Sequence, residues 1–314
     1  MVYNFAAAIM RATGDSTRPM IFLTLGGALK ILFSYLLVAT FNMGIPGVAI
    51  ATIISWALSA VLALVALTRP DREVRIKLRY LRLYKQELRD ILYIGAPAGF
   101  QSALYSIANV IISSTVNSFG PEATTGISIA NNFDGVLYNI STASAIAIMP
   151  YVSQNIGNKN IKRATQSVVR GIAVTVALGA FFGMLSAVFS AQLSSIMSDD
   201  PTVIAYSQQK MIIVSSTYFI CGINDIFGGA LRGMNKPIIP TVATLVFMCG
   251  IRFVWVYAIF PLYRNLTFLY LIWPIGWTLS IVTLLFFYFP TVRQYRKKFK
   301  TEAEQTSAEY IESV

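Results

Sequence analysis

The sequence alternates between long apolar stretches and short polar segments. Each stretch holds roughly twenty residues or more, which is enough for an α-helix to cross the hydrocarbon core of a bilayer. Segments of about ten residues with alternating polar and apolar positions, as in a membrane β-barrel, do not occur. The pattern predicts an all-α polytopic membrane protein with about eight transmembrane helices, at 19–41, 44–67, 91–119, 122–150, 168–193, 204–231, 237–263 and 267–290.

The composition supports this prediction. Hydrophobic residues make up 55% of the 314 residues, and charged residues only 12%. A soluble domain carries about a quarter charged residues, so these charges are too few to cover a water-facing surface. No soluble catalytic domain is therefore expected.

The positive charges are unevenly distributed along the chain. Of the 25 Lys and Arg residues, 20 fall into segments that an eight-helix path places on one side of the membrane, at 11–18, 69–90, 159–163, 232–236 and 293–300. Because basic loops stay in the cytoplasm, we predict a multi-pass protein of the bacterial inner (plasma) membrane with both termini cytoplasmic. The net charge of +11 is then a topology signal and does not indicate a nucleic-acid partner.

The sequence lacks the residues that several kinds of catalytic and metal-binding site require. The chain contains no His, which excludes imidazole metal sites and His-based catalytic triads, and its two Cys residues, Cys221 and Cys249, both lie inside predicted helices. They predict neither a disulfide framework nor a zinc site. We expect no enzyme and no cofactor. Met1–Ala12 also lacks the basic start of a signal peptide.

An internal repeat is present in the sequence. Three pairs of residues share one offset of 221 positions: Arg11 with Arg232, Pro19 with Pro240, and Trp56 with Trp277. Six predicted helices separate the members of each pair, so the repeat unit is a six-helix bundle with parallel orientation. The alternative is an eight-helix protein in which the similarity is due to chance.

The repeat predicts the organisation of the chain. Residues 1–68 would form the last two helices of an N-terminal bundle, and 91–292 a complete C-terminal six-helix bundle. Between them, 69–90 is a basic cytoplasmic linker or an interfacial helix that rests on anionic headgroups. The cytoplasmic tail, 293–314, is polar after Lys300 and is expected to be disordered there.

Several segments together carry a resemblance to a known family. They are RATGDSTRP (11–19), FNMGIPGVA (41–49), IGAPAGFQ (94–101), QNIGNKNIKRA (154–164), GALRGM (229–234) and CGIRFVW (249–255). Over 1–290 the chain resembles the multidrug and toxic compound extrusion (MATE) family, starting near the end of that family's fourth helix, although Asn158 replaces a usual Ala. The resemblance implies an efflux antiporter, driven by inward Na+ or H+, that exports bulky, often cationic amphipathic compounds.

Asp134 is the foremost candidate among charges inside predicted helices, where an ionisable residue is costly and by default functional. Its carboxylate would take up a proton, coordinate Na+ or attract a cationic substrate. The alternative is a structural ion pair with Lys30 or Arg252. These two cations are nearly related by the repeat, since Lys30 corresponds to position 251. We interpret them as charge-compensating residues.

Asp225 is the second candidate carboxylate. It faces the cavity together with Asn224, or else it joins a cytoplasmic charge network with Arg232 or Lys236. Neither arrangement is favoured by the sequence.

Polar and aromatic side chains are expected to complete the substrate and ion site. Gln101 and Asn109 share a helical face, and Asn131 and Tyr105 are further candidates for its lining. Asparagine and glutamine in membrane helices also form plain interhelical hydrogen bonds, and aromatic residues also serve as packing. Some branches of the family carry a carboxylate near the place of Tyr105, so the resemblance does not assign the coupling ion.

Three alternatives to efflux remain open. A flippase of the same superfamily, for lipid-linked saccharide or peptidoglycan precursors, would use basic residues such as Lys30 and Arg252 to hold diphosphate. A membrane-embedded enzyme would need a nucleophile with its base, or a metal cluster. A receptor-like or structural role would show no substrate-dependent change in thermal stability.

Overall fold

The structure, a computed structural model, describes residues 1–68, 82 and 84–313. Every regular element in these residues is helical, as predicted. The chain divides into two compact units, Met1–Lys85 and Gln86–Val314. Most of the predicted basic linker, 69–90, lies outside the described residues.

Residues 1–68 of the first unit form three helices. They are α1 (Val2–Ala12), α2 (Thr17–Tyr35), which continues through the π-helical turn η1 (Leu36–Thr40), and α3 (Gly44–Thr68). The hydroxyl of Tyr3 donates a hydrogen bond to the carbonyl of Pro19, 2.6 Å away, and so ties α1 to the start of α2. Small residues on α3, with Ser59 facing Gly26, allow α2 and α3 to pack closely.

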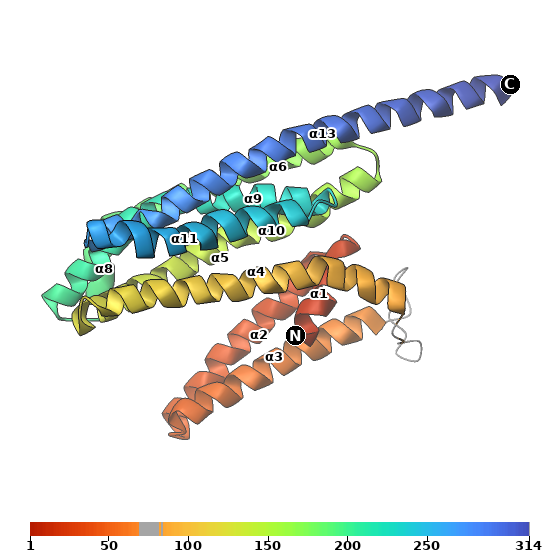
Figure 1. The fold of residues 1–314 in the computed structure, drawn as a ribbon. Coiled ribbons are helices and arrows are strands. Elements are labelled where there is room, and N and C mark those ends of the chain that lie inside the picture. Colours follow the sequence, from red (N-terminus) through yellow and green to blue (C-terminus); the bar gives the residue numbers. More distant parts are fainter. Residues whose placement is uncertain (69–81, 83, 314) are drawn as a thin grey trace. The chain divides into compact units, whose positions relative to one another are not determined.

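The second unit is a bundle of long helices that are continuous or broken by short irregular turns (Figure 1). Its first three long helices are α4 (Lys85–Asn117), α5 (Pro121–Gly157) and α6 (Ile161–Val188), followed by the short α7 (Ser190–Ser195). The next run joins α8 (Pro201–Val214), the 3-10 turn η3 (Ser215–Thr217) and α9 (Tyr218–Gly233).

The last two membrane helices are also interrupted. One run comprises α10 (Ile238–Thr244), the π-helical turn η4 (Leu245–Gly250), α11 (Ile251–Val254), a second π-helical turn η5 (Trp255–Ile259) and η6 (Phe260–Leu262). The final run comprises α12 (Leu266–Tyr270) and α13 (Ile272–Ser313).

Seven helices or helix runs in the described residues are long and apolar enough to span a membrane. They are 17–40, 44–68, 121–157, 161–188, 201–233, 238–262 and 266–302. The remaining predicted span, 91–119, corresponds to α4, which has sufficient length at 33 residues. Polar side chains along it, including Gln101, Ser106 and Asn109, lower its mean hydropathy. The protein is an all-α, multi-pass membrane protein.

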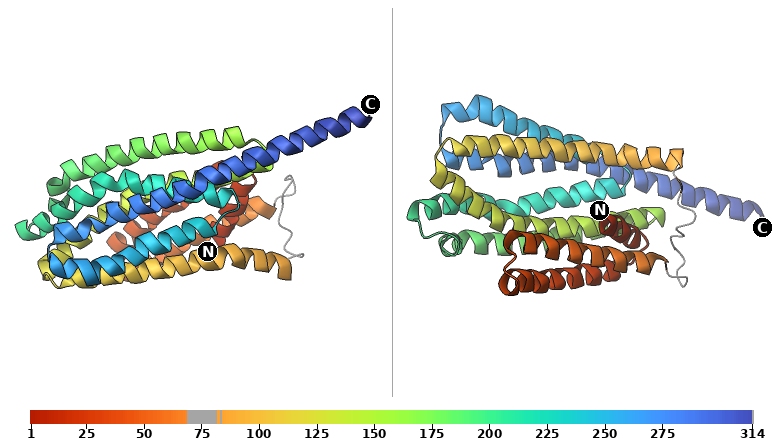
Figure 2. Two further views of the ribbon diagram at one scale, coloured as in Figure 1. Left: turned by 45° about the horizontal axis from the view of Figure 1, so that its top comes forward. Right: turned by 90° about the horizontal axis from the view of Figure 1, so that it is seen from below.

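Two expectations about helix ends were wrong. The predicted span 168–193 is shifted, because α6 begins at Ile161 and ends at Val188. The tail after Lys300 is not disordered but continues α13 to Ser313, and Figure 2 shows this end extending past the other helices of its unit. Two ion pairs favour this helix, Lys298 with Glu302 at 3.8 Å and Lys300 with Glu304 at 3.6 Å. The two members of each pair are four residues, or about one helical turn, apart.

Helix α9 packs tightly against α5 through glycines. A Cβ atom on Gly229 would lie 3.0 Å from the carbonyl oxygen of Ala145, and one on Gly233 would lie 2.6 Å from that of Met149. Small residues at such crossings allow membrane helices to approach closely. Apolar clusters fill both ends of the bundle, with Leu137 in one and Ile148 in the other. The contact with α5 fixes where α9 presents its polar residues.

Candidate functional site

Asp134 forms a buried ion pair with Lys210. The carboxylate Oδ2 of Asp134, on α5, lies 2.9 Å from Nζ of Lys210, on α8, and these residues are 9% and 2% exposed. Ser215 donates a hydrogen bond to Oδ1 of Asp134 at 3.1 Å. Both carboxylate oxygens are therefore engaged. The sequence had suggested Lys30 or Arg252 as the partner, and in the described structure the partner is Lys210.

The local helix geometry produces this arrangement. Asn131 lies one turn before Asp134 on α5, and its Oδ1 also accepts a hydrogen bond from Nζ of Lys210. The end of α8 tightens into the 3-10 turn η3, where Ser215 faces the carboxylate. The ammonium of Lys210 also lies 5.6 Å from the ring centre of Trp273, a cation–π contact.

A cavity of about 260 Å³ lies beside this pair. We call it the Asp134 cavity; its lining includes Tyr105, Asn109, Asn131, Asp134, Lys210, Tyr218, Tyr270 and Trp273. Aromatic rings and polar groups thus surround one carboxylate and one ammonium. The hydroxyl of Tyr270 is buried and has no hydrogen-bond partner among the described residues. Such a cavity suits a planar ligand with a polar or charged group.

Asp225 lines a second cavity, of about 290 Å³, which we call the Asp225 cavity. Its lining includes Gln101, Tyr105, Tyr138, Asn224, Asp225 and Arg232. The side chain of Asn224 hydrogen-bonds to the carboxylate of Asp225. Oδ1 of Asn224 and Oδ2 of Asp225 are buried, and neither receives a hydrogen bond from the part of the chain that the structure describes.

Arg232 shares the wall of the Asp225 cavity. Within 1–68, 82 and 84–313, no ion pair joins Asp225 to Arg232 or to Lys236. The cytoplasmic charge network considered for Asp225 is thus not formed by direct contacts in this conformation. Instead, two buried oxygen acceptors without a donor belong to residues that line this cavity.

Arg252 fixes α4 to the rest of its bundle. Its guanidinium donates hydrogen bonds to Oδ1 of Asn109 at 2.6 Å and to the hydroxyl of Tyr105 at 3.3 Å. It also lies 4.6 Å from the ring centre of Tyr105 and 5.5 Å from that of Trp273. Arg252 is 3% exposed and lines neither cavity. The basic lining that a flippase would use for diphosphate is therefore not supplied by this residue.

The predicted site residues separate into two groups. Asn109, Asn131 and Asp134 line the Asp134 cavity, whereas Gln101, Asn224 and Asp225 line the Asp225 cavity. Tyr105 lines both. Lys30 belongs to the first unit, where it lines a pocket of about 190 Å³ between α2 and α3. Its predicted role as a charge-compensating residue stays a prediction.

Three residues that the sequence had not singled out complete the Asp134 site. Lys210 carried a signal, because it is a charged residue inside the predicted span 204–231, where a charge is costly. Ser215 and Trp273 carried none, since a hydroxyl and an indole are both common in membrane helices. Their roles follow only from how η3 and α13 pack within the bundle, since α13 packs against α9 and η3 against α6 and α8.

The family model described as MatE matches residues 97–258, just over half of the chain. The chain belongs to the MATE family. Among curated MATE relatives is a Bacillus subtilis (strain 168) protein named "Probable multidrug resistance protein YpnP", 25% identical over 252 residues. That match covers 80% of this chain and 56% of the relative. A protein of Shewanella oneidensis named "FAD transporter" is 24% identical over 242 residues, with 75% and 53% coverage.

Solved MATE structures share the fold. An outward-facing structure of a multidrug resistance MATE transporter of the MOP superfamily superposes with a TM-score of 0.83, at 17% identity, over 94% of this chain and 66% of the other. The chain spans a little over half the length of the curated MATE relatives described above. Both cavities include residues of the matched region, with Asp134, Lys210 and Asp225 inside it.

Proposed function

We propose that this MATE-family chain acts in secondary active efflux, exporting small amphipathic organic molecules in exchange for inward Na+ or H+. The observation that carries the proposal is the pair of buried, unsatisfied oxygens, Asn224 Oδ1 and Asp225 Oδ2, in two residues that line the Asp225 cavity. A buried acceptor without a donor is costly. A proton or a coordinated cation removes that cost, so this wall is suited to bind and release the coupling ion.

Asp225 is accordingly the better candidate for the coupling ion than Asp134. Both oxygens of Asp134 already have partners, Lys210 and Ser215. Na+ or a cationic substrate that binds Asp134 competes with the ammonium of Lys210 for the carboxylate. We infer that Asp134 and Lys210 exchange partners with a charged substrate: a cationic group would take the place of Lys210, and an anionic group that of Asp134.

The aromatic walls of the Asp134 cavity support a planar substrate. Tyr105, Tyr218 and Trp273 line the space next to the ion pair, and their rings can stack on a flat ligand. The names of two relatives, one a multidrug resistance protein and one an FAD transporter, are consistent with flat, charged organic cargo. We therefore propose aromatic, charged amphipathic compounds as the substrate class.

Tyr105 gives the two proposed sites a physical connection. Its side chain lines both cavities, and its position is held by the stacked guanidinium of Arg252. Loss or gain of a cation at Asp225 would change the electrostatic environment of Tyr105 and, through it, the shape of the Asp134 cavity. Transport would then follow the rocking of two bundles between inward- and outward-open states, in a plasma membrane with both termini cytoplasmic.

Efflux of a fluorescent aromatic cation, ethidium, from cells that express the protein and lack other ethidium exporters tests the proposal. We expect Asp225→Asn to abolish efflux driven by a Na+ or proton gradient, while Asp225→Glu retains part of it. Asp199→Asn, at an exposed loop position, is the matched control and should leave efflux unchanged. Gradient-driven efflux by Asp225→Asn at the rate of the unmodified protein would overturn the assignment of Asp225.

A further inference from the structure

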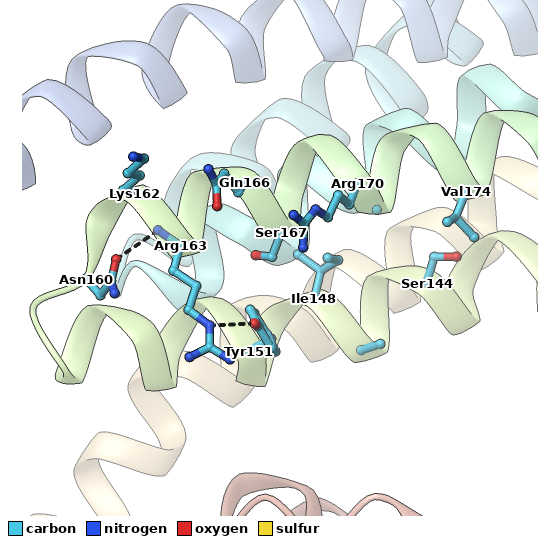
Figure 3. Close-up of a pocket in the computed structure, with 12 residues that line it drawn as sticks. Ser144, Ile148, Tyr151, Asn160, Lys162, Arg163, Gln166, Ser167, Arg170 and Val174 are labelled. Carbon is cyan, nitrogen blue, oxygen red and sulfur yellow. Dashed lines mark hydrogen bonds between the residues drawn. The ribbon is translucent and has the colours of Figure 1, made fainter.

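A groove of about 660 Å³ between α5 and α6 shares no lining residue with the Asp134 or Asp225 cavity. Figure 3 shows Arg163 extending from α6 across the groove to Tyr151 on α5, whereas the side chain of Arg170 lies along α6 beside Ser167. Lys162 lies at the same end of the groove as Arg163, and none of the Asp and Glu residues that the structure describes is part of the lining. The groove is therefore strongly cationic at one end.

Arg170 carries a positive charge in this groove that no protein group balances among the described residues. It lies inside a helix that is apolar enough to span the membrane, at 161–188. Among the described residues its guanidinium has neither a carboxylate partner nor a hydrogen-bond acceptor. An arginine at this depth is costly unless an anion or water accompanies it. Arg170 also falls within the predicted span 168–193.

Arg163 is held in a position to bind an anion. Its Nε donates a hydrogen bond to the hydroxyl of Tyr151 at 2.9 Å, and its guanidinium lies 5.8 Å from the ring centre of Tyr151. The two terminal nitrogens have no acceptor within the described residues. Arg163 and Arg170 are seven residues apart, which is about two helical turns or 10 Å, so both face the groove from one side of α6.

The opposite end of the groove is mostly apolar, with Ser144 as its polar side chain. Ile148 on α5 and Val174 on α6 form its walls, and the side chain of Val174 is 53% exposed. Because α5 and α6 are both apolar enough to span the membrane, this end faces a hydrocarbon environment unless another part of the protein covers it. The cationic end of the groove is the one nearer the loop between α5 and α6. The distribution of Lys and Arg places that loop in the cytoplasm.

We propose that this groove is a binding site for an anionic phospholipid of the cytoplasmic leaflet. The lipid phosphate would lie between Arg163 and Arg170, and an acyl chain would extend along Ile148 and Val174. Basic pockets between transmembrane helices on the cytoplasmic side recognise such headgroups, and arginine binds phosphate through paired hydrogen bonds. The site does not depend on which molecule the protein transports.

Native mass spectrometry of the purified protein, after exchange into micelles with equal amounts of phosphatidylglycerol and phosphatidylcholine, tests this site. We expect the unmodified protein to retain phosphatidylglycerol selectively. The double variant Arg163→Gln with Arg170→Gln should lose that selectivity by about tenfold. The matched control Lys300→Gln, which removes one charge at a position 79% exposed, should retain it.

Further measurements distinguish binding of a lipid from binding of free phosphate, and loss of the site from misfolding of the variant. Inorganic phosphate alone should not raise the thermal stability of the protein, whereas phosphatidylglycerol should; equal protection by phosphate would overturn the lipid assignment. Arg170→Lys keeps the charge and should keep most of the selectivity, which checks that the helix still packs. Unchanged selectivity in the double variant would also refute the site.

Discussion

Lys210 of α8 contacts the carboxylate of Asp134 on α5, with 2.9 Å between Nζ and Oδ2, and both side chains are almost completely buried. This contact joins two helices through opposite charges in a region where a single charge is unfavourable. The pair therefore has a structural consequence as well as the proposed role in substrate exchange. The two effects can be separated by experiment.

Removal of one partner should destabilise the second unit. Asp134→Leu leaves the ammonium of Lys210 buried without its counter-ion, and loss of one member of a buried pair costs about 3–5 kcal/mol. Replacing both, with Asp134→Leu and Lys210→Met, should cost less than the sum of the single changes. Unfolding in detergent micelles, followed by tryptophan fluorescence, measures this double-mutant cycle. Additive losses would show that the two residues do not interact.

Reversal of the pair separates structure from transport. Asp134→Asn alone should abolish gradient-driven ethidium efflux. In the exchange variant, Asp134→Lys with Lys210→Asp, opposite charges are again adjacent and stability should largely return. Efflux should stay at background, because the carboxylate now lies on α8 rather than α5. Efflux at the unmodified level in the exchange variant would mean that the pair serves only the fold.

Arg252 is expected to control how firmly α4 is attached to its bundle. Arg252→Lys loses the forked contact with Asn109 and Tyr105, since an ammonium cannot reproduce guanidinium geometry. The free energy of unfolding should fall by about 1–3 kcal/mol. Tyr105→Phe keeps the ring under the guanidinium and loses only the longer hydrogen bond, so its effect should be smaller. Hydrogen exchange of α4 amides should increase in the first variant and change little in the second.

The close contact between α9 and α5 predicts that a Gly→Ala substitution lowers stability at this contact but not at an open position. Gly233→Ala places a methyl group 2.6 Å from the carbonyl oxygen of Met149, and such overpacking costs about 1–3 kcal/mol. Gly95→Ala, where a Cβ meets nothing within 4 Å, should be neutral or stabilise α4 by up to about 1 kcal/mol. Thermal unfolding of the two variants checks the contrast. Equal melting temperatures would show that α5 and α9 separate readily.

Most of the helical architecture could be predicted from the sequence, because backbone groups in hydrocarbon must be satisfied within a helix. The lengths of the apolar stretches therefore translate almost directly into helices. The end of α13 was missed although its signal was present. Lys and Glu spaced four residues apart, as at Lys298 and Glu302, favour a helix even in water.

The pairing of charges was less predictable than their positions. Asp134 and Asp225 were recognised as costly residues in apolar segments, and the structure places both at cavity walls. The partner of Asp134 depends on which face of α8 packs against α5, and sequence spacing carries no information about that contact. For the same reason, the stacking of Arg252 on Tyr105 could not be distinguished in advance from an ion pair with Asp134.

The π-helical turn η4, Leu245–Gly250, bears on the history of the chain. Its hydrogen bonds enclose one residue more than an α-helical turn, and the corresponding stretch of α2 is α-helical. The offset of 221 places Lys30 at position 251, one short of Arg252. One codon inserted at this turn after a gene duplication, and one codon lost before Trp277, where the offset is 221 again, would restore Lys30 and Arg252 to equivalent places in their helices. An alignment of the two halves should therefore open one gap at this turn and a compensating gap before Trp277.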